Sequence, residues 1–380
     1  MSNTNRQSST KRQNLFWGLP LFCPILLGLA AISFFILIVA RHNSAFAFSF
    51  NTTVGAAVRA TLAWITNIFP FSFAELLIFL LPLFLFLAIF FALRHTEKSL
   101  KGILIYTALL ISILSVLFTL FAFGFGTGYY TPSLEKQLDL ASNPVSAEEL
   151  KATALWLVNE IDQYRDRITY STSGASRMPY SLNEMNTQLM SAYHGIHQKY
   201  PFIQGFQSNI KPVMSSVAMS YLHITGVYSF FTGEANLNVD FPDYTLPFTA
   251  AHEFAHQRGI ARENEANFVA FLVCAASDDP YLQYSGYLNL YEYVIVALYS
   301  ADPEAYVEVH SLLSEEARGE IRAYSAFYDK YRDSEAAKVG TAVNDAYLQA
   351  NGNKEGTKSY GMVVDLAVAY YKTVICHEPS

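Results

Sequence analysis

Long runs of apolar residues fill the first third of the chain. The stretches 15–40 and 102–125 contain no charged side chain, and the stretch 73–93 contains only Glu75, near its start. About 20 apolar residues in a helix cross the hydrocarbon core of a bilayer, so each stretch is long enough to span a membrane. We therefore expect a short N-terminal tail at residues 1–14, followed by a transmembrane region at residues 15–128 with three spans.

Two details bear on this membrane topology. A secretory signal peptide would also begin with an apolar run, but this run is too long, and no small-residue cleavage site stands out before Arg41. The stretch Val54–Phe69 carries Arg59 and Trp64 and is short for a span, so we expect an interfacial helix there. If that stretch were a fourth span, the rest of the chain would lie on the opposite side of the membrane.

The basic residues beside the spans favour one orientation. Three precede the first span and three lie between the second and third, whereas only Arg41 and Arg59 lie between the first and second. Because Lys and Arg accumulate on the cytoplasmic side, we expect a cytoplasmic N-terminus and, after three spans, an extracytoplasmic C-terminal domain.

From Tyr129 onward the apolar and polar residues alternate with the periods of soluble secondary structure. The 252 residues 129–380 are enough for one sizeable core. Ser146 is a suitable N-cap, with Glu148 and Glu149 in the first turn that follows. We expect an α+β domain, mainly helical with a small sheet within 214–240. The helices are expected at 147–167, 182–200, 250–258, 262–276, 287–300, 303–313, 315–331 and 360–373.

Composition and charge narrow the class of protein further. Hydrophobic residues make up 52% of the 380 residues and charged residues only 15%, which is too apolar for an ordinary soluble protein. Eight of the 25 basic and two of the 32 acidic residues precede Tyr129, leaving 17 basic and 30 acidic residues after it, a net charge of −13. This acidic balance argues against a nucleic-acid partner. The three cysteines are too dispersed to indicate a disulfide framework.

The sequence HEFAH, from His252 to His256, is the motif that carries chemistry. Two histidines four positions apart lie on one face of a helix, where both imidazoles can bind one Zn²⁺. Glu253 is turned about 100° from His252, toward the place of a zinc-bound water. The motif therefore predicts a zinc hydrolase in which Glu253 activates that water. The apolar approach to the helix argues against a chance match on a surface, since an unliganded histidine pair would be costly in a core.

Catalytic zinc needs a third protein ligand. Gly259 matches the glycine of the metzincin pattern HExxHxxGxxH, but Arg262 stands where that pattern has its third histidine, and arginine cannot ligate a metal. Glu263 and Glu265 are the next candidates, at the start of a second helix. Gly259 suits the end of a helix, so the chain can turn back and bring this second helix beside the first.

At this second helix the chain resembles the gluzincins whose third-ligand helix reads ExxA(D/N)xxA, as in the membrane heat-shock and prenyl-protein peptidases. Glu263, Ala266, Asn267 and Ala270 match that pattern. The resemblance implies that Glu263 is the third zinc ligand and that Asn267 helps to orient a zinc histidine from the second shell. Only six residues separate His256 from Glu263, fewer than is usual in those families, so Glu265 stays open as the alternative ligand.

A likeness over nearly the whole chain rests on three N-terminal spans followed by MSYLHITGVYSFFTGEANLNVD at 219–240 and LPFTAAHEFAHQRGIARENEANF at 246–268. These features resemble an uncharacterised bacterial family of three-span membrane proteins, described as a domain of unknown function with a peptidase-like motif. The resemblance implies a multi-pass protein of the bacterial cytoplasmic membrane and supplies no substrate.

The segment Gly233–Asp240 offers a place for a substrate. It could form the edge strand above the zinc, where an extended peptide would pair with the main chain beside Asn236 and Asn238. A buried structural strand is the alternative. Donors to a developing oxyanion could be a tyrosine or histidine nearby, and four candidates are Tyr228, His223, Tyr284 and Tyr360.

The function expected from the sequence is a membrane-anchored zinc metalloendopeptidase that hydrolyses peptide bonds. Two alternatives stay open: a zinc-stabilised binding or assembly module without catalysis, and a zinc amidase that acts on cell-wall peptides. The expected partners are a peptide or protein substrate and the lipid bilayer. We expect no nucleic acid and no organic cofactor.

Overall fold

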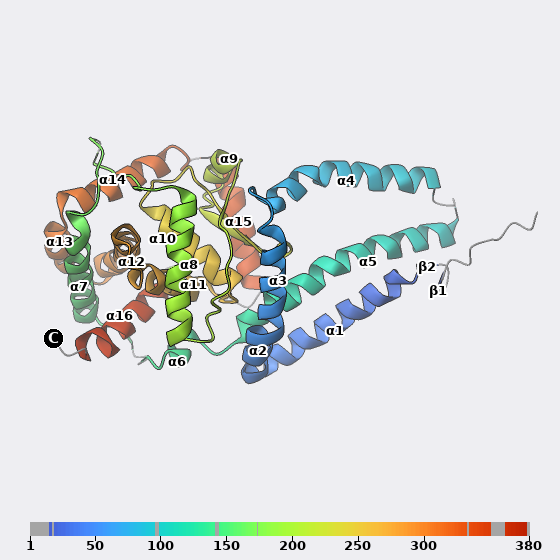
Figure 1. Cartoon of the computed structure of the whole chain (residues 1–380), viewed down its shortest axis with the longest axis horizontal. Helices are drawn as coiled ribbons and strands as arrows, with labels where there is room; N and C mark the ends of the chain where they lie inside the picture. Colours follow the sequence, from blue (N-terminus) through green and yellow to red (C-terminus); the bar gives the residue numbers. More distant parts are fainter. Residues whose placement is uncertain are drawn as a thin grey trace, which may run out of the picture.

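The computed structural model describes residues 15–16, 19–95, 99–140, 144–172, 174–332, 334–350 and 362–377. Three long apolar helices extend from one side of a helical body (Figure 1). Each is long and apolar enough to cross a membrane, and the three coincide with the stretches expected to be spans. They are α1 (Phe22–His42), α4 (Phe73–His95) and α5 (Leu100–Gly124). The predicted tail at residues 1–14 lies outside the described residues.

The first span begins later than expected. Leu15–Phe16 and Leu19–Pro20 form a short antiparallel pair, β1 and β2, and α1 starts only at Phe22. Pro20 explains the shift, because a proline has no backbone N–H and disfavours helical backbone in the residue before it.

Three short helical pieces connect the first two spans and lie between the spans and the body (Figure 1). They are α2 (Ser44–Phe50), the π-helical turn η1 (Asn51–Gly55) and α3 (Ala56–Thr66). The helix expected within Val54–Phe69 is thus present as α3. With 11 residues, α3 is too short to cross a bilayer. Its side chains differ sharply in environment, since Arg59 is fully buried and Trp64 is 71% exposed.

The body is mainly helical with a small sheet, as the sequence predicts. The predicted N-cap Ser146 is confirmed: its side chain accepts from the N–H of Glu149, and the Glu149 carboxylate completes a capping box. The helices and helical turns of the body are η2 (Gly126–Tyr130), α6 (Leu134–Gln137), α7 (Ala147–Arg165), α8 (Leu182–Lys199), α9 (Ser216–Tyr221), α10 (Thr245–Gln257), α11 (Glu263–Ala275), α12 (Pro280–Ala301), α13 (Pro303–Leu312), α14 (Glu315–Asp329), α15 (Glu335–Ala350), α16 (Val363–Thr373) and η4 (Ile375–His377).

Several helices differ from the expectation, and α12 and α15 differ most. The helix expected from Tyr287 begins at Pro280, because Asp279 accepts from the N–H groups of Tyr281 and Leu282 and a proline fits the first helical position. Helix α15 was not expected at all. The hydroxyl of Ser334 accepts from the N–H of Ala337 and caps its first turn.

The core of the body surrounds α10 and α11. Every residue of α10 is buried, and α11 packs between α10 and α12. The HEFAH helix is therefore central to the body.

The small sheet has three short strands in the order β3-β5-β4, with bounds Lys211–Pro212, Glu234–Leu237 and Gly226–Ser229. Strand β5 pairs in parallel with β3 and antiparallel with β4. The expectation of an edge strand within Gly233–Asp240 is therefore wrong, because β5 is the central strand.

Asn236 and Asn238 are consequently not available to a substrate. Both side chains are buried. The amide of Asn236 donates to the carbonyl of Val227 and accepts from Ser72, and the amide of Asn238 donates to the carbonyl of Ile224. Their role is to satisfy buried polar groups within and beside the sheet.

Carboxylates join the second span to the sheet region. Glu234 accepts from the backbone N–H groups of Phe73 at 3.0 Å and Ala74 at 2.7 Å, at the start of α4. Glu75, in the first turn of the same helix, accepts from the N–H groups of Met214 and Ser215. A negative charge at a helix N-terminus pairs with N–H groups that no helical carbonyl can reach, so these contacts fix α4 to the body.

Arg59 joins α3 to two other helix ends. Its guanidinium donates to Asn51 Oδ1 at 2.9 Å, to the carbonyl of Gly124 at 3.1 Å and to that of Arg258 at 3.4 Å. Gly124 ends the third span, and Arg258 follows the last residue of α10. Burial lowers the pKa of Arg59 to about 10, so it is still charged at neutral pH. A single cation thus stabilises the carboxyl ends of both helices.

Gly259 is a sensitive point of this junction. Its φ is +94°, and an added Cβ would lie 2.5 Å from Nη2 of Arg59. We expect Gly259→Ala to destabilise the protein by about 1–3 kcal/mol or more, because backbone strain and a steric clash act together. Thermal unfolding of the purified full chain in detergent measures this. Gly195→Ala is the matched control: this exposed glycine of α8 has open space at Cβ, and the variant should be unchanged or up to about 1 kcal/mol more stable. Equal effects of both variants would contradict the prediction.

Glu320 of α14 is a buried carboxylate, and it makes stability depend on pH. It accepts from the N–H of Ser176 at 2.8 Å, but burial raises its pKa to about 7. Because this pKa is raised above the unfolded value, its contribution to stability is fully present below about pH 4.5 and is lost as the pH rises through about 7. We expect Glu320→Gln to lose less thermal stability than the parent between pH 5 and pH 8. Parallel melting curves at both pH values test this, and identical slopes would refute it.

Candidate metal centre

The two helices of the candidate centre form a tight hairpin. Helix α10 ends at Gln257, and the chain reverses at Gly259 in the left-handed region that glycine favours. The N–H groups of Gly259 and Ile260 donate to the carbonyls of His256 and Ala255, which closes the end of α10. Helix α11 then starts at Glu263 and packs along α10.

This hairpin brings His252, His256 and Glu263 together. Oε2 of Glu263 lies 3.2 Å from Nε2 of His252 and 3.3 Å from Nε2 of His256. One ligand atom from each residue lies within 4.8 Å of the other two, and all three residues are buried. The two imidazole rings are nearly perpendicular, with centroids 4.6 Å apart. The three side chains form a buried group that could hold a metal ion.

The tautomer of His256 suits a metal ligand. Its Nδ1 lies 2.8 Å from the carbonyl oxygen of Ile260. Because a carbonyl oxygen can only accept, Nδ1 carries the hydrogen, and the lone pair of neutral His256 is on Nε2, the atom that faces Glu263. A backbone carbonyl that fixes the far nitrogen is a common support for a metal-bound histidine.

The charges of the His-His-Glu group favour a proton or a cation between the three side chains. Burial alone would lower the pKa of His256, but the Glu263 carboxylate outweighs it and raises that pKa to about 9. Burial opposes the charge of Glu263 too, and the two histidines nevertheless hold its pKa well below the usual range. Two neutral Nε2 lone pairs facing a carboxylate would repel one another, so a proton or a cation must lie among them. A divalent ion bound by all three side chains meets this need, and the donor set fits one.

Glu253 lies beside this group and is not one of its three members. It is buried, and burial raises its pKa to about 6 despite the neighbouring histidines. The backbone of Tyr228 in β4 makes a hydrogen bond to its carboxylate. Strand β4 approaches so closely that a Cβ on Gly226 would lie 2.6 Å from Oε1 of Glu253. The absence of a side chain at Gly226 thus makes room for this carboxylate.

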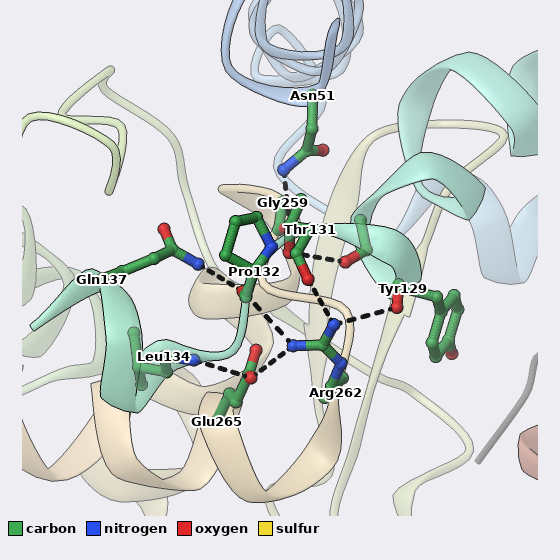
Figure 2. Close-up of polar contacts among 10 residues, drawn as sticks. Asn51, Tyr129, Thr131, Pro132, Leu134, Gln137, Gly259, Arg262 and Glu265 are labelled. Atoms are coloured by element: carbon green, nitrogen blue, oxygen red, sulfur yellow. Dashed lines mark hydrogen bonds and ion pairs between the residues drawn. The ribbon is translucent and has the colours of Figure 1, made fainter. Parts of the chain in front are cut away.

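Glu265, the alternative ligand, is bound elsewhere. Figure 2 shows its carboxylate between Nη1 of Arg262, at 2.5 Å, and the backbone N–H of Leu134, at 2.9 Å. Arg262 also donates to the carbonyls of Tyr129 at 3.1 Å and Thr131 at 2.5 Å. The arginine in the position of the metzincin histidine therefore attaches the start of α11 to the segment that follows the third span.

The end of the third span lies against the candidate centre. The ring of Phe125, directly after α5, is 5.6 Å from the ring of His256 and 5.5 Å from that of Tyr228. Phe125, Tyr129, Tyr228 and Ala261 form one buried cluster. Aromatic side chains thus pack between the end of α5, a helix long enough to cross a membrane, and α10, the HEFAH helix.

Only some of the remaining predicted site residues lie near the candidate centre. Asn267 is one turn beyond Glu263, but its Nδ2 lies 3.4 Å from Oη of Tyr293, and no hydrogen bond joins it to either histidine within the described structure. Of the oxyanion candidates, Tyr228 is adjacent to the centre. His223 is hydrogen-bonded to Tyr328 and to the carbonyl of Tyr331. Tyr284 is buried among core residues, and Tyr360 lies outside the described residues.

Sequence reasoning missed Gly226, Phe125 and Tyr293. Burial raises the pKa of Tyr293, and the charges of Glu292 and Glu263 add to this effect, which keeps the hydroxyl protonated near the candidate ligand. No spacing rule could have found these residues, because each reaches the centre through tertiary packing. Gly226, the first residue of β4, was the only local signal, because a glycine within a strand often marks a close approach of the backbone.

The fold and the centre together define a membrane-associated, mainly helical protein with a buried His-His-Glu group. A family model described as "Protein of unknown function (DUF3810)" matches residues 50–368, and the chain belongs to this family. The matched residues include α4, α5 and the candidate centre. Comparisons with curated proteins and with solved structures give no match.

Removal of one carboxylate at a time distinguishes the two candidate ligands. We expect Glu263→Gln to lower the affinity of the purified full chain for an added divalent metal ion by more than about 10-fold, a loss known even for residues that only support a ligand. Glu265→Gln, the matched control two positions away, should retain the metal and melt at a lower temperature, since it weakens the contacts to Arg262 and Leu134. Elemental analysis with melting curves measures both. Metal loss confined to Glu265→Gln would reverse the assignment.

Proposed function

We propose that the protein is a membrane-anchored, zinc-dependent metallopeptidase of gluzincin type that hydrolyses peptide bonds. The observation that carries the proposal is the buried group of His252, His256 and Glu263, with Glu253 beside it and outside the ligand set. We further propose a location in the bacterial cytoplasmic membrane, as the family resemblance implies, with the C-terminal domain outside the cytoplasm, as the distribution of basic residues favours.

The donor set supports zinc as the metal. Two histidines and one glutamate are the protein ligands of several catalytic zinc sites, in which a fourth position stays open for water or substrate. A zinc ion bound here would supply a Lewis acid that polarises a carbonyl and makes water more acidic. His256 would enter this ligand set in its correct tautomer, because the carbonyl of Ile260 holds its Nδ1–H.

Glu253 is the residue that we propose to move the proton. As a general base it takes a proton from the attacking water, and as a general acid it gives that proton to the amine nitrogen of the leaving product. Its backbone contact with Tyr228 and the close approach of Gly226 hold the carboxylate in place. The aromatic wall of Phe125 and Tyr228 keeps bulk water from one side of the centre.

Strand β4 is the proposed place for the peptide, instead of β5. It pairs with β5 on one side, and the backbone of Tyr228 on β4 bonds to Glu253. A peptide extended along β4 would therefore pass beside the proposed base, with main-chain pairing that depends little on its side chains.

Glu253→Gln tests the catalytic role. We expect the variant to keep its zinc and to cleave peptides about 10²–10⁴-fold more slowly than the parent, because the amide cannot accept the proton. The assay uses the full chain in detergent, with a pool of quenched fluorescent peptides and, in a separate arm, cell-wall stem peptides. Glu148→Gln, at an exposed position of α7, is the matched control and should cleave like the parent.

Each of the other outcomes has a distinct meaning. Cleavage of stem peptides alone would favour the amidase. Bound zinc without cleavage in either arm would favour the binding or assembly module. A parent without zinc, or a Glu253→Gln variant as active as the parent, would refute the proposal.

A further inference from the structure

An apolar face lies on the side of the body from which the second span departs. Its five members are exposed, with Met214 at 83%, Ile68 at 74%, Trp64 at 71%, Val217 at 53% and Phe71 at 39%. We call these five residues the α3–α9 face. Three of them lie on α3 or in the connection from α3 to α4, and the other two lie on α9 or just before it, about 150 positions later in the chain. Figure 1 shows α9 beside the ends of α3 and α4.

Polar contacts hold the two segments of this face together. Nζ of Lys211 donates to the carbonyls of Thr66, at 3.1 Å, and Phe69. The N–H of Asn209 donates to Oδ1 of Asn67 at 3.0 Å, and the N–H of Met214 donates to Glu75 at 2.9 Å. These bonds attach the α9 segment of the body to the connection that leads into α4.

The charged groups of this region point inward. Lys211 is 2% exposed and Glu75 is 8% exposed, and both are taken up by the contacts just described. The segments 64–72 and 213–217, which carry the five residues of the α3–α9 face, contain no charged residue. A face of this kind has no means of binding a charged partner, whereas an exposed apolar patch of large side chains marks a surface that is covered in the native environment.

We propose that the α3–α9 face is a bilayer-contact surface, which inserts into the interface between lipid headgroups and acyl chains. Continuity identifies the lipid as the occupant: the apolar helix α4 begins at Phe73, two positions after Phe71, and is long enough to cross a membrane. Trp64 supports a position of this face in the interface, since tryptophan prefers the membrane interface. The short α3 then lies in the interface, and α9 brings the body down to the same level.

This contact determines the orientation of the body relative to the membrane. The contacts of Glu75, Glu234 and Arg59 already fix the body to the spans, and contact of the α3–α9 face with the bilayer then sets the tilt of body and spans together. The candidate centre is then held close to the membrane surface, as the contact between Phe125 and His256 also requires. The proposal does not depend on the reaction, because none of the five residues belongs to the His-His-Glu group.

Tryptophan fluorescence of the full chain in lipid nanodiscs tests the proposal. The chain has three tryptophans, Trp17, Trp64 and Trp156, so the difference between the parent and Trp64→Phe isolates the signal of Trp64. We expect this signal to be about two-fold or more lower in brominated phosphatidylcholine than in the unbrominated lipid, as for an interfacial tryptophan, and to resist acrylamide.

A second pair of variants tests α9 separately. In the Trp64→Phe background, the fluorescence added by Met214→Trp should be quenched by brominated lipid in the same way. Val307→Trp is the matched control, because Val307 is 64% exposed on α13, at the end of the body away from the spans (Figure 1). Its added fluorescence should be quenched by acrylamide and not by lipid.

Two results would overturn the proposal. If acrylamide quenches the Trp64 and Met214→Trp signals as strongly as the Val307→Trp signal, the face is exposed to water. If neither lipid nor acrylamide quenches them, a protein covers the face, and a second copy of the chain is then the occupant to test by cross-linking. Trp64→Phe and Met214→Trp change exposed residues outside the core. A folding defect in either variant would appear as a lower melting temperature and can be separated from a change in quenching.

Discussion

Backbone carbonyls at the turn between α10 and α11 must find donors, because the helix that ends there cannot supply them and water is excluded. Arg59 donates to the carbonyl of Arg258, and Asn51 donates to that of Gly259 at 3.0 Å. Arg262, at the start of α11, donates to the carbonyls of Tyr129 and Thr131 in the segment that follows the third span. These donors come from the membrane-proximal helices and from the hairpin itself. One hydrogen-bond network, charge-assisted at Arg59 and Arg262, therefore holds span, connection and candidate centre together.

This network crosses the boundary that composition places at Tyr129. The residues after Tyr129 contain the candidate ligands, but Asn51 and Arg59 come from the region before it. A chain cut at Gly128 would leave the carbonyls of Arg258 and Gly259 without these donors. The composition of the sequence separates lipid-facing from water-facing surface, and it does not separate the units that fold together.

Local signals in the sequence predicted much of the fold and the centre of the candidate site. The three spans follow from apolar length alone, and Ser146 with Glu149 follows from capping chemistry within one turn. The hairpin that places Glu263 beside the histidines follows from Gly259 and from helical spacing. In each case the residues that determine the structure lie within a few positions of one another, so a short-range rule is sufficient.

The errors about the substrate strand and the surroundings of the site concern pairings between distant segments. The alternating residues of β5 were recognised, but its central place depends on Lys211–Pro212, more than 20 positions upstream, which pairs on its second edge. Asn236 and Asn238 look like surface polar residues by pattern, and only the tertiary structure supplies the buried partners that they satisfy. Arg262 was recognised as unable to bind a metal, and its structural role became visible only with the segment after the third span in place. For the same reason the sequence could not reveal the contact of Phe125 with the candidate centre.

The short hairpin also bears on how the chain folds. His252, His256 and Glu263 all come from 12 consecutive residues. Closing so short a loop costs little chain entropy, and contacts between neighbours in sequence form faster than those between distant strands. An ion that binds these three side chains would therefore cross-link a local unit and stabilise α10 and α11 against each other.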